Sequence, residues 1–283
     1  MKYGGHIFLW TDRWSNEQLD LFDRARRLGL DFLELAVGDD IEFDAVAVRR
    51  RAESLEMDVV LSPGGDWPME ADLSHDDAEC RVLGFDWHRN WLERAADAGA
   101  VAYTGAIYGH PGCVQRRLPP PDELPRAAEN LGRLADRAAE LGIVIAIEPM
   151  SHFRTHLVNT VAQARRLLDL AERPALRLLL DTYHLVTEIR DYATAIREAG
   201  DRLWGVHACE NDRGVPGGGL VPWPTIFETL REVEFDGYLG FETYNSSLSD
   251  FAPRRGMFHN VCPDGDTFVN EALSFVRTGL AAS

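Results

Sequence analysis

Short apolar runs alternate with amphipathic helical patterns along the whole chain, and this alternation limits the possible folds more than any other feature. The apolar runs are rich in Val, Ile, Leu and aromatic residues, which is typical of strands buried on both faces of a sheet. The segments between them carry helix start and stop signals: Ser15–Leu28 begins at a capping Ser and precedes Gly29, and Pro125–Leu141 precedes Gly142. The expected strands are His6–Trp10, Phe32–Ala36, Asp58–Ser62, Val101–Ile107, Ile143–Glu148, Leu178–Asp181, Leu203–His207 and Tyr238–Glu242. The other expected helices are Asn159–Leu170, Asp191–Ala199, Thr225–Val233 and Thr267–Leu280.

Alternating strands and helices of this length fold either as a closed parallel barrel or as an open, doubly wound sheet. No GxGxxG motif follows the first expected strand, which argues against a dinucleotide-binding sheet. The chain has 283 residues, a length that suits one barrel, and no strong linker divides it. We therefore predict an α/β protein with a (β/α)8 TIM barrel, formed by residues 1–283 as a single domain.

Charge and cysteine usage narrow the classes of partner and compartment. The formal net charge is −17, whereas surfaces that bind nucleic acid or anionic lipid carry an excess of Lys and Arg, so neither partner is expected. The N-terminus lacks the pattern of a signal peptide, and no apolar stretch is long enough to span a membrane. The cysteines form no CxxC motif, and reduced thiols in a cytoplasmic protein are expected. They are Cys80, Cys113, Cys209 and Cys262.

Four successive strands in the second half of the chain each end in a side chain that can bind a metal ion. Glu148 ends one run, Asp181 the next, His207 the third and Glu242 the fourth, at intervals of about one strand–helix unit. In a parallel barrel the carboxyl ends of all strands open on one face, where active sites lie. These four side chains are therefore expected to converge.

Three converging carboxylates repel one another unless a cation lies between them. Oxygen ligands with one imidazole suit Mn²⁺, Mg²⁺ or Co²⁺ better than a thiolate-seeking ion. Each residue alone has another interpretation, as a helix N-cap or a surface carboxylate at the start of a loop. Because all four occur in register on consecutive strands, we favour one divalent-metal site.

The sequence around these residues resembles the sugar phosphate isomerase/epimerase family with the xylose isomerase-like barrel. Within that family it is most similar to the ketose 3-epimerases that act on D-tagatose, D-psicose or L-ribulose. The resemblance covers nearly the whole chain. The matching stretches are Gly105–Gly109, Ile147–Pro149, Leu180–His184, His207–Gly217 continuing to Trp223, and Gly240–Glu242.

The resemblance implies a metal-dependent isomerase that epimerises C3 of a ketose through a cis-enediolate. Its ligands would be Glu148, Asp181, His207 and Glu242, which would hold Mn²⁺, with Co²⁺ or Mg²⁺ as alternatives, and Glu148 and Glu242 would also transfer protons. The family further implies a dimer or tetramer. The residues that would bind the sugar are His184, Arg213, Arg154 and Tyr108.

These substrate residues differ in how well they follow the family pattern. His184 and Arg213 match residues that hold the carbonyl end of the sugar, although Arg213 could instead form a surface ion pair with Asp212 or Glu210, and His184 could be a core histidine. Arg154 stands where the family often has a glutamate that helps to bind the sugar, so the range of substrates is expected to differ. Tyr108 could line a sugar site or pack in the core.

Three alternatives remain open from the sequence. The first is another keto-sugar enzyme on the same scaffold: an aldose–ketose isomerase, a hydroxypyruvate-type isomerase, a keto-inositol dehydratase or the catalytic subunit of a C-glycoside deglycosidase. The second is an apurinic endonuclease, which the missing additional histidine in residues 208–224 and the negative charge oppose. The third is a non-catalytic sugar-binding protein, which has no need of two glutamates acting as bases.

Overall fold

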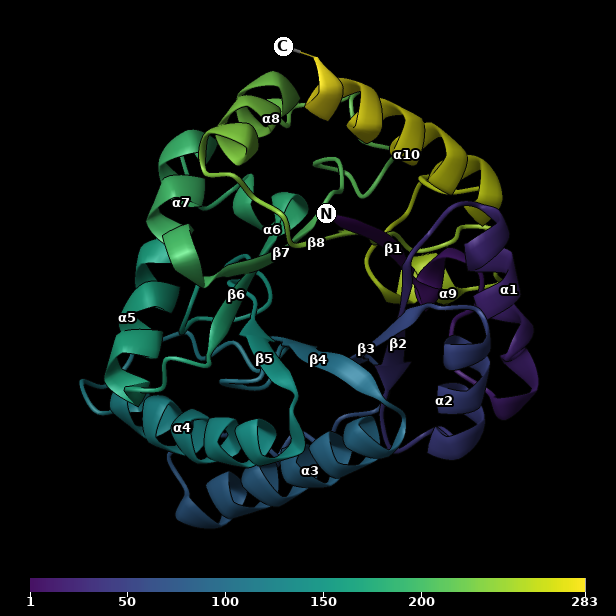
Figure 1. Ribbon diagram of the computed structural model, residues 1–283. Coiled ribbons are helices and arrows are strands. Elements are labelled where there is room, and N and C mark those ends of the chain that lie inside the picture. The colour runs from purple at the N-terminus through teal and green to yellow at the C-terminus, as the bar shows by residue number, and fades with distance from the viewer. Residues whose placement is uncertain (283) are drawn as a thin grey trace.

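The apolar runs of the chain pair in sequence order as parallel strands and close on themselves. The computed structural model describes residues 1–282, and in this part of the chain eight strands form a closed barrel in which β1 pairs with both β2 and β8. The helices form a ring around the barrel (Figure 1). The strands are β1 (Lys2–His6), β2 (Phe32–Val37), β3 (Asp58–Pro63), β4 (Ala100–Gly105), β5 (Val144–Ile147), β6 (Arg177–Asp181), β7 (Leu203–His207) and β8 (Tyr238–Phe241). The predicted (β/α)8 TIM barrel is confirmed.

Seven of the expected strands coincide with observed strands to within a few residues, but the first expectation is wrong. The apolar run after His6 begins with a 3-10 turn, Ile7–Leu9, and the strand lies before it. This strand contains Gly4, where a Cβ would lie only 2.4 Å from the ring of Phe32. Glycine is needed there because the Phe32 ring fills the barrel next to it, yet glycine weakens any strand pattern in a sequence.

The helices follow the strands and bring the chain back to the start of the next strand, and two of them, at 45–54 and 78–97, were not among those expected from the sequence. α4 ends at Gly142, which adopts the left-handed conformation (φ 73°), and α5 begins with a capping box between Thr160 and Gln163. The expected Ser15–Leu28 helix is split into a 3-10 turn, Asn16–Gln18, and α1. The helices are α1 (Asp20–Arg27), α2 (Ala45–Ser54), α3 (Ala78–Asp97), α4 (Glu123–Leu141), α5 (Val161–Ala171), α6 (Thr182–Leu185), α7 (Tyr192–Ala199), α8 (Trp223–Glu232), α9 (Phe251–Arg254) and α10 (Gly265–Ala281).

The interior of the barrel is apolar at one end and polar at the other. Phe32, Val60 and Ala102 form a small buried cluster on β2, β3 and β4, separate from the main core between strands and helices. Further along the same strands toward their carboxyl ends come Glu34 and Thr104, both buried. The polar end is therefore the face on which the loops after the strands meet. Within residues 1–282, none of the helices has the length and apolar character that a membrane span requires.

Candidate active site

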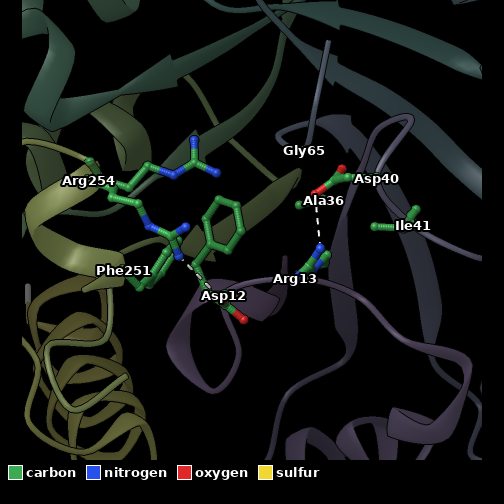
Figure 2. Close-up of a pocket in the computed structure, with 10 residues that line it drawn as sticks. Asp12, Arg13, Ala36, Asp40, Ile41, Gly65, Phe251 and Arg254 are labelled. Carbon is green, nitrogen blue, oxygen red and sulfur yellow. Dashed lines mark hydrogen bonds and ion pairs between the residues drawn. The ribbon is translucent and has the colours of Figure 1, made fainter. Parts of the chain in front are cut away.

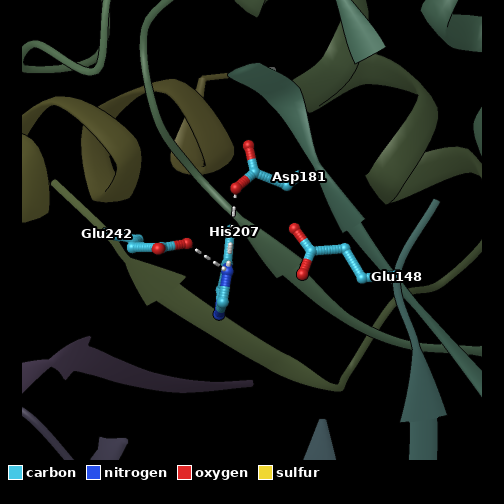
Figure 3. A group of neighbouring side chains, drawn as sticks. All are labelled: Glu148, Asp181, His207 and Glu242. Atoms are coloured by element: carbon cyan, nitrogen blue, oxygen red, sulfur yellow. Dashed lines mark ion pairs between the residues drawn. The ribbon is translucent and has the colours of Figure 1, made fainter. Parts of the chain in front are cut away.

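The four predicted metal ligands meet at the carboxyl ends of β5 to β8. Each of Glu148, Asp181, His207 and Glu242 offers a ligand atom, and these atoms lie within 4.8 Å of one another. Figure 3 shows Glu148 and Glu242 on opposite sides of the group, with their carboxylates directed toward each other. The spacing of one strand–helix unit in the sequence thus becomes one compact cluster.

The donor atoms of this cluster fit a divalent cation. Two of them, Oε1 of Glu148 and Nδ1 of His207, are buried and accept or donate no well-formed hydrogen bond in the part of the chain that the structure describes, although Nδ1 lies 3.1 Å from Oε2 of Glu242. Buried polar atoms are rarely left without a partner, because their desolvation costs about 1–3 kcal/mol. An ion between the three carboxylates and the imidazole would satisfy both atoms and offset the repulsion. The set of oxygen and imidazole donors suits Mn²⁺, Mg²⁺ or Co²⁺.

Glu34 on β2 holds the imidazole of His207 from the side away from the cluster. The distance between Nε2 of His207 and Oε2 of Glu34 is 2.8 Å, and Thr104 donates to the other carboxylate oxygen at 2.9 Å. This bond directs Nδ1 toward the three carboxylates, as outer partners of metal-binding histidines commonly do. Sequence reasoning missed Glu34. Its signal was a lone carboxylate inside the apolar run Phe32–Ala36, where a buried charge requires a partner.

Arg213 is buried inside the cluster rather than exposed in a surface ion pair. Its side chain is 1% exposed, and Nη1 donates to Oδ2 of Asp181 at 2.6 Å and to Oε2 of Glu242 at 3.2 Å. The guanidinium lies over the ring of Tyr183, 4.3 Å from its centroid. The alternative of a surface pair with Asp212 or Glu210 is wrong, because the loop turns Arg213 inward, with a left-handed φ of 67°.

Glu210 organises the loop that carries Arg213. Its carboxylate accepts hydrogen bonds from the indole of Trp223 and from the backbone amides of Gly217 and Val221, at 2.8–2.9 Å. Burial opposes the ionisation of Glu210, but these donors outweigh it and lower the pKa of the carboxyl. Glu210 is therefore an ionised centre around which the chain folds from β7 to the start of α8, and the sequence pattern did not single it out.

The two glutamates of the cluster have opposite proton affinities. Burial and the neighbouring charge of Asp181 raise the pKa of Glu148 well above its ordinary value. Burial acts in the same direction on Glu242, but Arg213 and His207 outweigh it and hold the pKa of Glu242 well below its ordinary value. These opposite directions distinguish the two carboxyls in the absence of a cation. A pair with such divided proton affinities can act as acid and base.

His184 lies beside both Glu148 and Arg213 and is neutral near pH 7. Burial lowers the pKa of His184 to about 4. Its Nε2 accepts from Nη2 of Arg213 at 3.2 Å and lies 3.9 Å from Oε1 of Glu148. The core-histidine interpretation is correct as to its burial, but the ring also lines the cavity above the cluster.

The cavity above the cluster brings together most of the remaining candidate residues. His184, Arg213 and Arg154 line it, with Tyr244 and Arg255 from the segment after β8. Tyr108 does not line this cavity. Its ring is fully buried, and its hydroxyl donates to the backbone carbonyls of Glu148 and Val158, at 3.0 Å each. Of the two interpretations of Tyr108, packing is the one this arrangement supports, so we do not propose it as a substrate residue.

A second cavity of about 270 Å³ adjoins the first, with Phe8 and Arg255 in both walls. Figure 2 shows charged pairs on its rim: Arg13 faces Asp40 at 3.9 Å, and Arg254 faces Asp12 at 3.4 Å. The two cavities therefore meet at Phe8 and Arg255, and the inner one is lined by Glu148, His207 and Glu242 of the cluster.

Fold and site together define a barrel with a cluster of carboxylates and an imidazole, able to hold a metal ion, at the carboxyl ends of its strands. The profile of the family described as "Xylose isomerase-like TIM barrel" matches residues 22–268. The chain belongs to this family. The resemblance to the ketose 3-epimerases that the motifs indicated is also confirmed by the relatives that follow.

Characterised relatives of the chain are sugar epimerases. The "Ketose 3-epimerase" of Arthrobacter globiformis is 29% identical over 287 residues, which cover 100% of this chain and 98% of that protein. The crystal structure of D-allulose 3-epimerase from Methylomonas sp. in complex with D-allulose has a TM-score of 0.89 and 27% identity, over 98% of this chain and 96% of that one. The "3-dehydro-D-guloside 4-epimerase" of Escherichia coli (strain K12) is 32% identical over 172 residues, which are 58% of this chain and 64% of that protein. These relatives are isomerase-class enzymes, as predicted for this chain.

Proposed function

We propose that this protein is a metal-dependent ketose 3-epimerase in which Glu148 and Glu242 exchange the proton on C3. The observation that carries the proposal is the placement of these two carboxylates on opposite sides of one cluster. The names of the relatives support the same reaction.

The carbon next to a ketone is a weak acid, so its proton leaves only to a positioned base while the resulting enediolate is stabilised. One glutamate removes the proton from one face of the substrate, and the other returns a proton to the opposite face, which inverts C3. In one direction Glu242 would accept the proton, and Glu148 would carry the proton that is returned. The reverse reaction exchanges these roles.

Glu148, Asp181, His207 and Glu242 would hold one divalent cation, with Mn²⁺ as our first choice and Co²⁺ or Mg²⁺ as alternatives. When bound, the cation would supply Lewis-acid stabilisation of the negative charge that develops on the ketone oxygen. Its charge would also favour the ionised form of Glu148, which has no cationic contact as close as those of Glu242.

Arg213 and His184 orient the carbonyl end of the substrate. Nε of Arg213 is buried without a partner among residues 1–282, so it can donate to a substrate oxygen. His184 is held against Arg213 as a neutral ring. It can therefore form a directed hydrogen bond to the substrate without adding another full charge to the site. Donors fixed before the substrate arrives are the arrangement that stabilises a developing oxyanion.

A second candidate function is epimerisation at C4 of a 3-keto-glycoside. The relative from Escherichia coli carries such an activity in its name, and the adjoining outer cavity offers room for the group attached to the sugar. The chemistry is the same, since the proton at C4 of such a substrate also lies next to a ketone. The two candidates differ only in which carbon is placed between the glutamates.

A product screen tests the proposal. The Mn²⁺-loaded protein is incubated with free ketopentoses and ketohexoses and, separately, with 3-keto-glucosides, each with and without a chelator. We expect a C3 epimer from at least one ketose, lost on chelation and restored by Mn²⁺ or Co²⁺. Conversion of the 3-keto-glucosides alone would replace the first candidate with the second, and no epimer from any substrate would contradict both.

The oligomeric state expected from the sequence, a dimer or a tetramer, stays a prediction.

A further inference from the structure

Arg255 lies on the wall of the cavity above the cluster, which we call the metal-site cavity, and its charge has no carboxylate partner in the described part of the chain. It follows α9 in the segment between β8 and α10, and no acidic side chain of residues 1–282 lies within ion-pair distance of it. Its guanidinium lies 4.7 Å from the ring centroid of Phe8, and Nη2 donates to the carbonyl of Gly64 at 2.6 Å. These contacts hold the guanidinium of Arg255 at the junction of the two cavities, and they leave most of its N–H donors free within residues 1–282.

Arg154 is a second such cation on the wall of the same cavity. It lies in the loop between β5 and α5, its side chain is exposed, and the described part of the chain gives it no ion pair. The charges of Arg154 and Arg255 both act on the hydroxyl of Tyr244: burial raises the pKa of this tyrosine, and Arg213, Arg255 and Arg154 oppose the increase. The two arginines therefore act on one region of the cavity, around Tyr244.

The neighbouring Arg254, in contrast to Arg255, forms ion pairs with acidic side chains. It pairs with Asp12 at 3.4 Å and with Asp250 at 3.3 Å, and it lines only the outer cavity. Partners were thus available to arginines of this segment, and Arg255 is directed away from them toward the metal-site cavity.

The balance of charge in the cavity leaves a cation in excess. Four carboxylates with little exposure belong to the cluster and its support: Glu34, Glu148, Asp181 and Glu242. One of the two catalytic glutamates would carry the proton that the reaction returns, so a divalent ion and Arg213 balance the other three carboxylates. Arg154 and Arg255 add positive charge to the cavity wall, so the occupied site favours a substrate that brings negative charge.

We propose, building on the epimerase function above, that the substrate carries a carboxylate or phosphate remote from its reacting carbonyl, bound by Arg154 and Arg255. Arginine is suited to this role because its planar N–H donors match two oxygens of either group. The neutral sugars named for the relatives offer no such group. This chain would therefore act on an acidic or phosphorylated keto sugar in preference to a free ketose.

Three ketoses that differ mainly at C6 test the proposal: D-fructose, D-fructose 6-phosphate and D-fructuronate. Turnover by the Mn²⁺-loaded protein is compared as kcat/KM, and binding is measured in parallel by calorimetry. We expect at least one of the two anionic sugars to exceed D-fructose by about tenfold or more, with a preference that weakens as salt is added. Whichever anionic sugar is preferred identifies the carboxylate or the phosphate as the natural group.

Arg154→Gln and Arg255→Gln are compared with Arg254→Gln as the matched control. We expect the anionic-to-neutral ratio to fall about tenfold in the first two variants and to stay at the wild-type value in the control. Because Arg255 packs on Phe8, Arg255→Lys is included, and it should retain the fold and part of the preference. Equal or better binding and turnover of D-fructose by the wild type, or an unchanged ratio in both variants, would overturn the proposal.

The calorimetric arm separates this inference from the epimerase function. If no sugar is epimerised but the anionic sugars still bind more tightly through Arg154 and Arg255, the reaction is wrong and the anion site stands. If D-fructose is epimerised and the anionic sugars are neither bound nor turned over better, the reaction stands and the anion site is wrong.

Discussion

Nε2 of His207 lies 2.8 Å from a carboxylate oxygen of Glu34, so a residue of β2 orients the imidazole of β7, a proposed metal ligand, across the barrel. The charge of Glu34 raises the pKa of His207 well above its ordinary value, although burial alone would lower it. In Glu34→Gln the side chain still accepts a hydrogen bond but no longer carries the charge. We expect Mn²⁺ affinity, measured by competition with a chelator, to fall by roughly 10- to 100-fold, as is typical for outer partners of metal-bound histidines.

Thr104→Val is the control for this substitution, since it removes one hydrogen bond to Glu34 and leaves the carboxylate in place. Its effect on Mn²⁺ affinity should be clearly smaller than that of Glu34→Gln. Equal affinity in wild type and Glu34→Gln would show that Glu34 supports only the fold.

Metal content tests the cluster itself. We expect about one divalent ion per chain in protein purified with Mn²⁺ and close to none after dialysis against a chelator. The double variant Glu148→Gln, His207→Ala removes two ligands and should bind little metal while keeping the circular dichroism spectrum of the barrel. Full metal content in that variant would place the ion elsewhere.

Glu210 should affect the reaction through the position of Arg213. Glu210→Gln removes the charge on which the amides of Gly217 and Val221 and the Trp223 indole converge, so the loop loses its anchor. We expect kcat/KM to fall by about 10- to 100-fold, equivalent to roughly 1.4–2.7 kcal/mol, with metal content unchanged. Asp212→Asn, at an exposed position in the same loop, should have little effect. Loss of metal in Glu210→Gln would contradict a role confined to the loop.

The buried His88 should make the fold sensitive to acid. Burial, assisted by His110, lowers the pKa of His88 from 6.5 to about 3, so the folded protein keeps this ring neutral where the unfolded chain protonates it. Because folding lowers the pKa of His88, the protonation of this residue in the unfolded chain does not reduce the free energy of unfolding above about pH 6.5. Between pH 6.5 and about 3, the free energy of unfolding should therefore fall by about 1.4 kcal/mol per pH unit from this group.

Urea denaturation of His88→Gln between pH 7 and pH 4 checks this. The variant should be less stable than the wild type at pH 7, since it loses the bond between His88 and the Tyr103 hydroxyl, but its stability should fall less steeply with pH. His259→Gln, at an exposed histidine, should follow the wild type. Parallel curves for His88→Gln and wild type would exclude His88 as a source of the pH dependence.

The sequence predicts the barrel and the convergence of four side chains well, because both follow from one periodic feature. Strand ends recur at each strand–helix unit, so the spacing alone marks Glu148, Asp181, His207 and Glu242 as neighbours. Glu34 was missed because its partner is 173 positions away and nothing local identifies it. The sequence left Tyr108 open between sugar contact and core packing, because a strand-end aromatic looks the same in sequence whether it faces the cavity or the core. The first strand was misplaced because Gly4 and Gly5 fit against Phe32 and Leu9 only in three dimensions.

The central claim, proton exchange between two glutamates on opposite sides of the substrate, is tested most directly by epimerisation in D₂O. The Mn²⁺-loaded protein is incubated with a ketose that it converts, and the product is analysed by NMR and mass spectrometry. The account predicts one deuterium at C3 of the epimer, and no turnover with Glu242→Gln or Glu148→Gln. Epimer formed without deuterium at C3, or full activity in either variant, would contradict it.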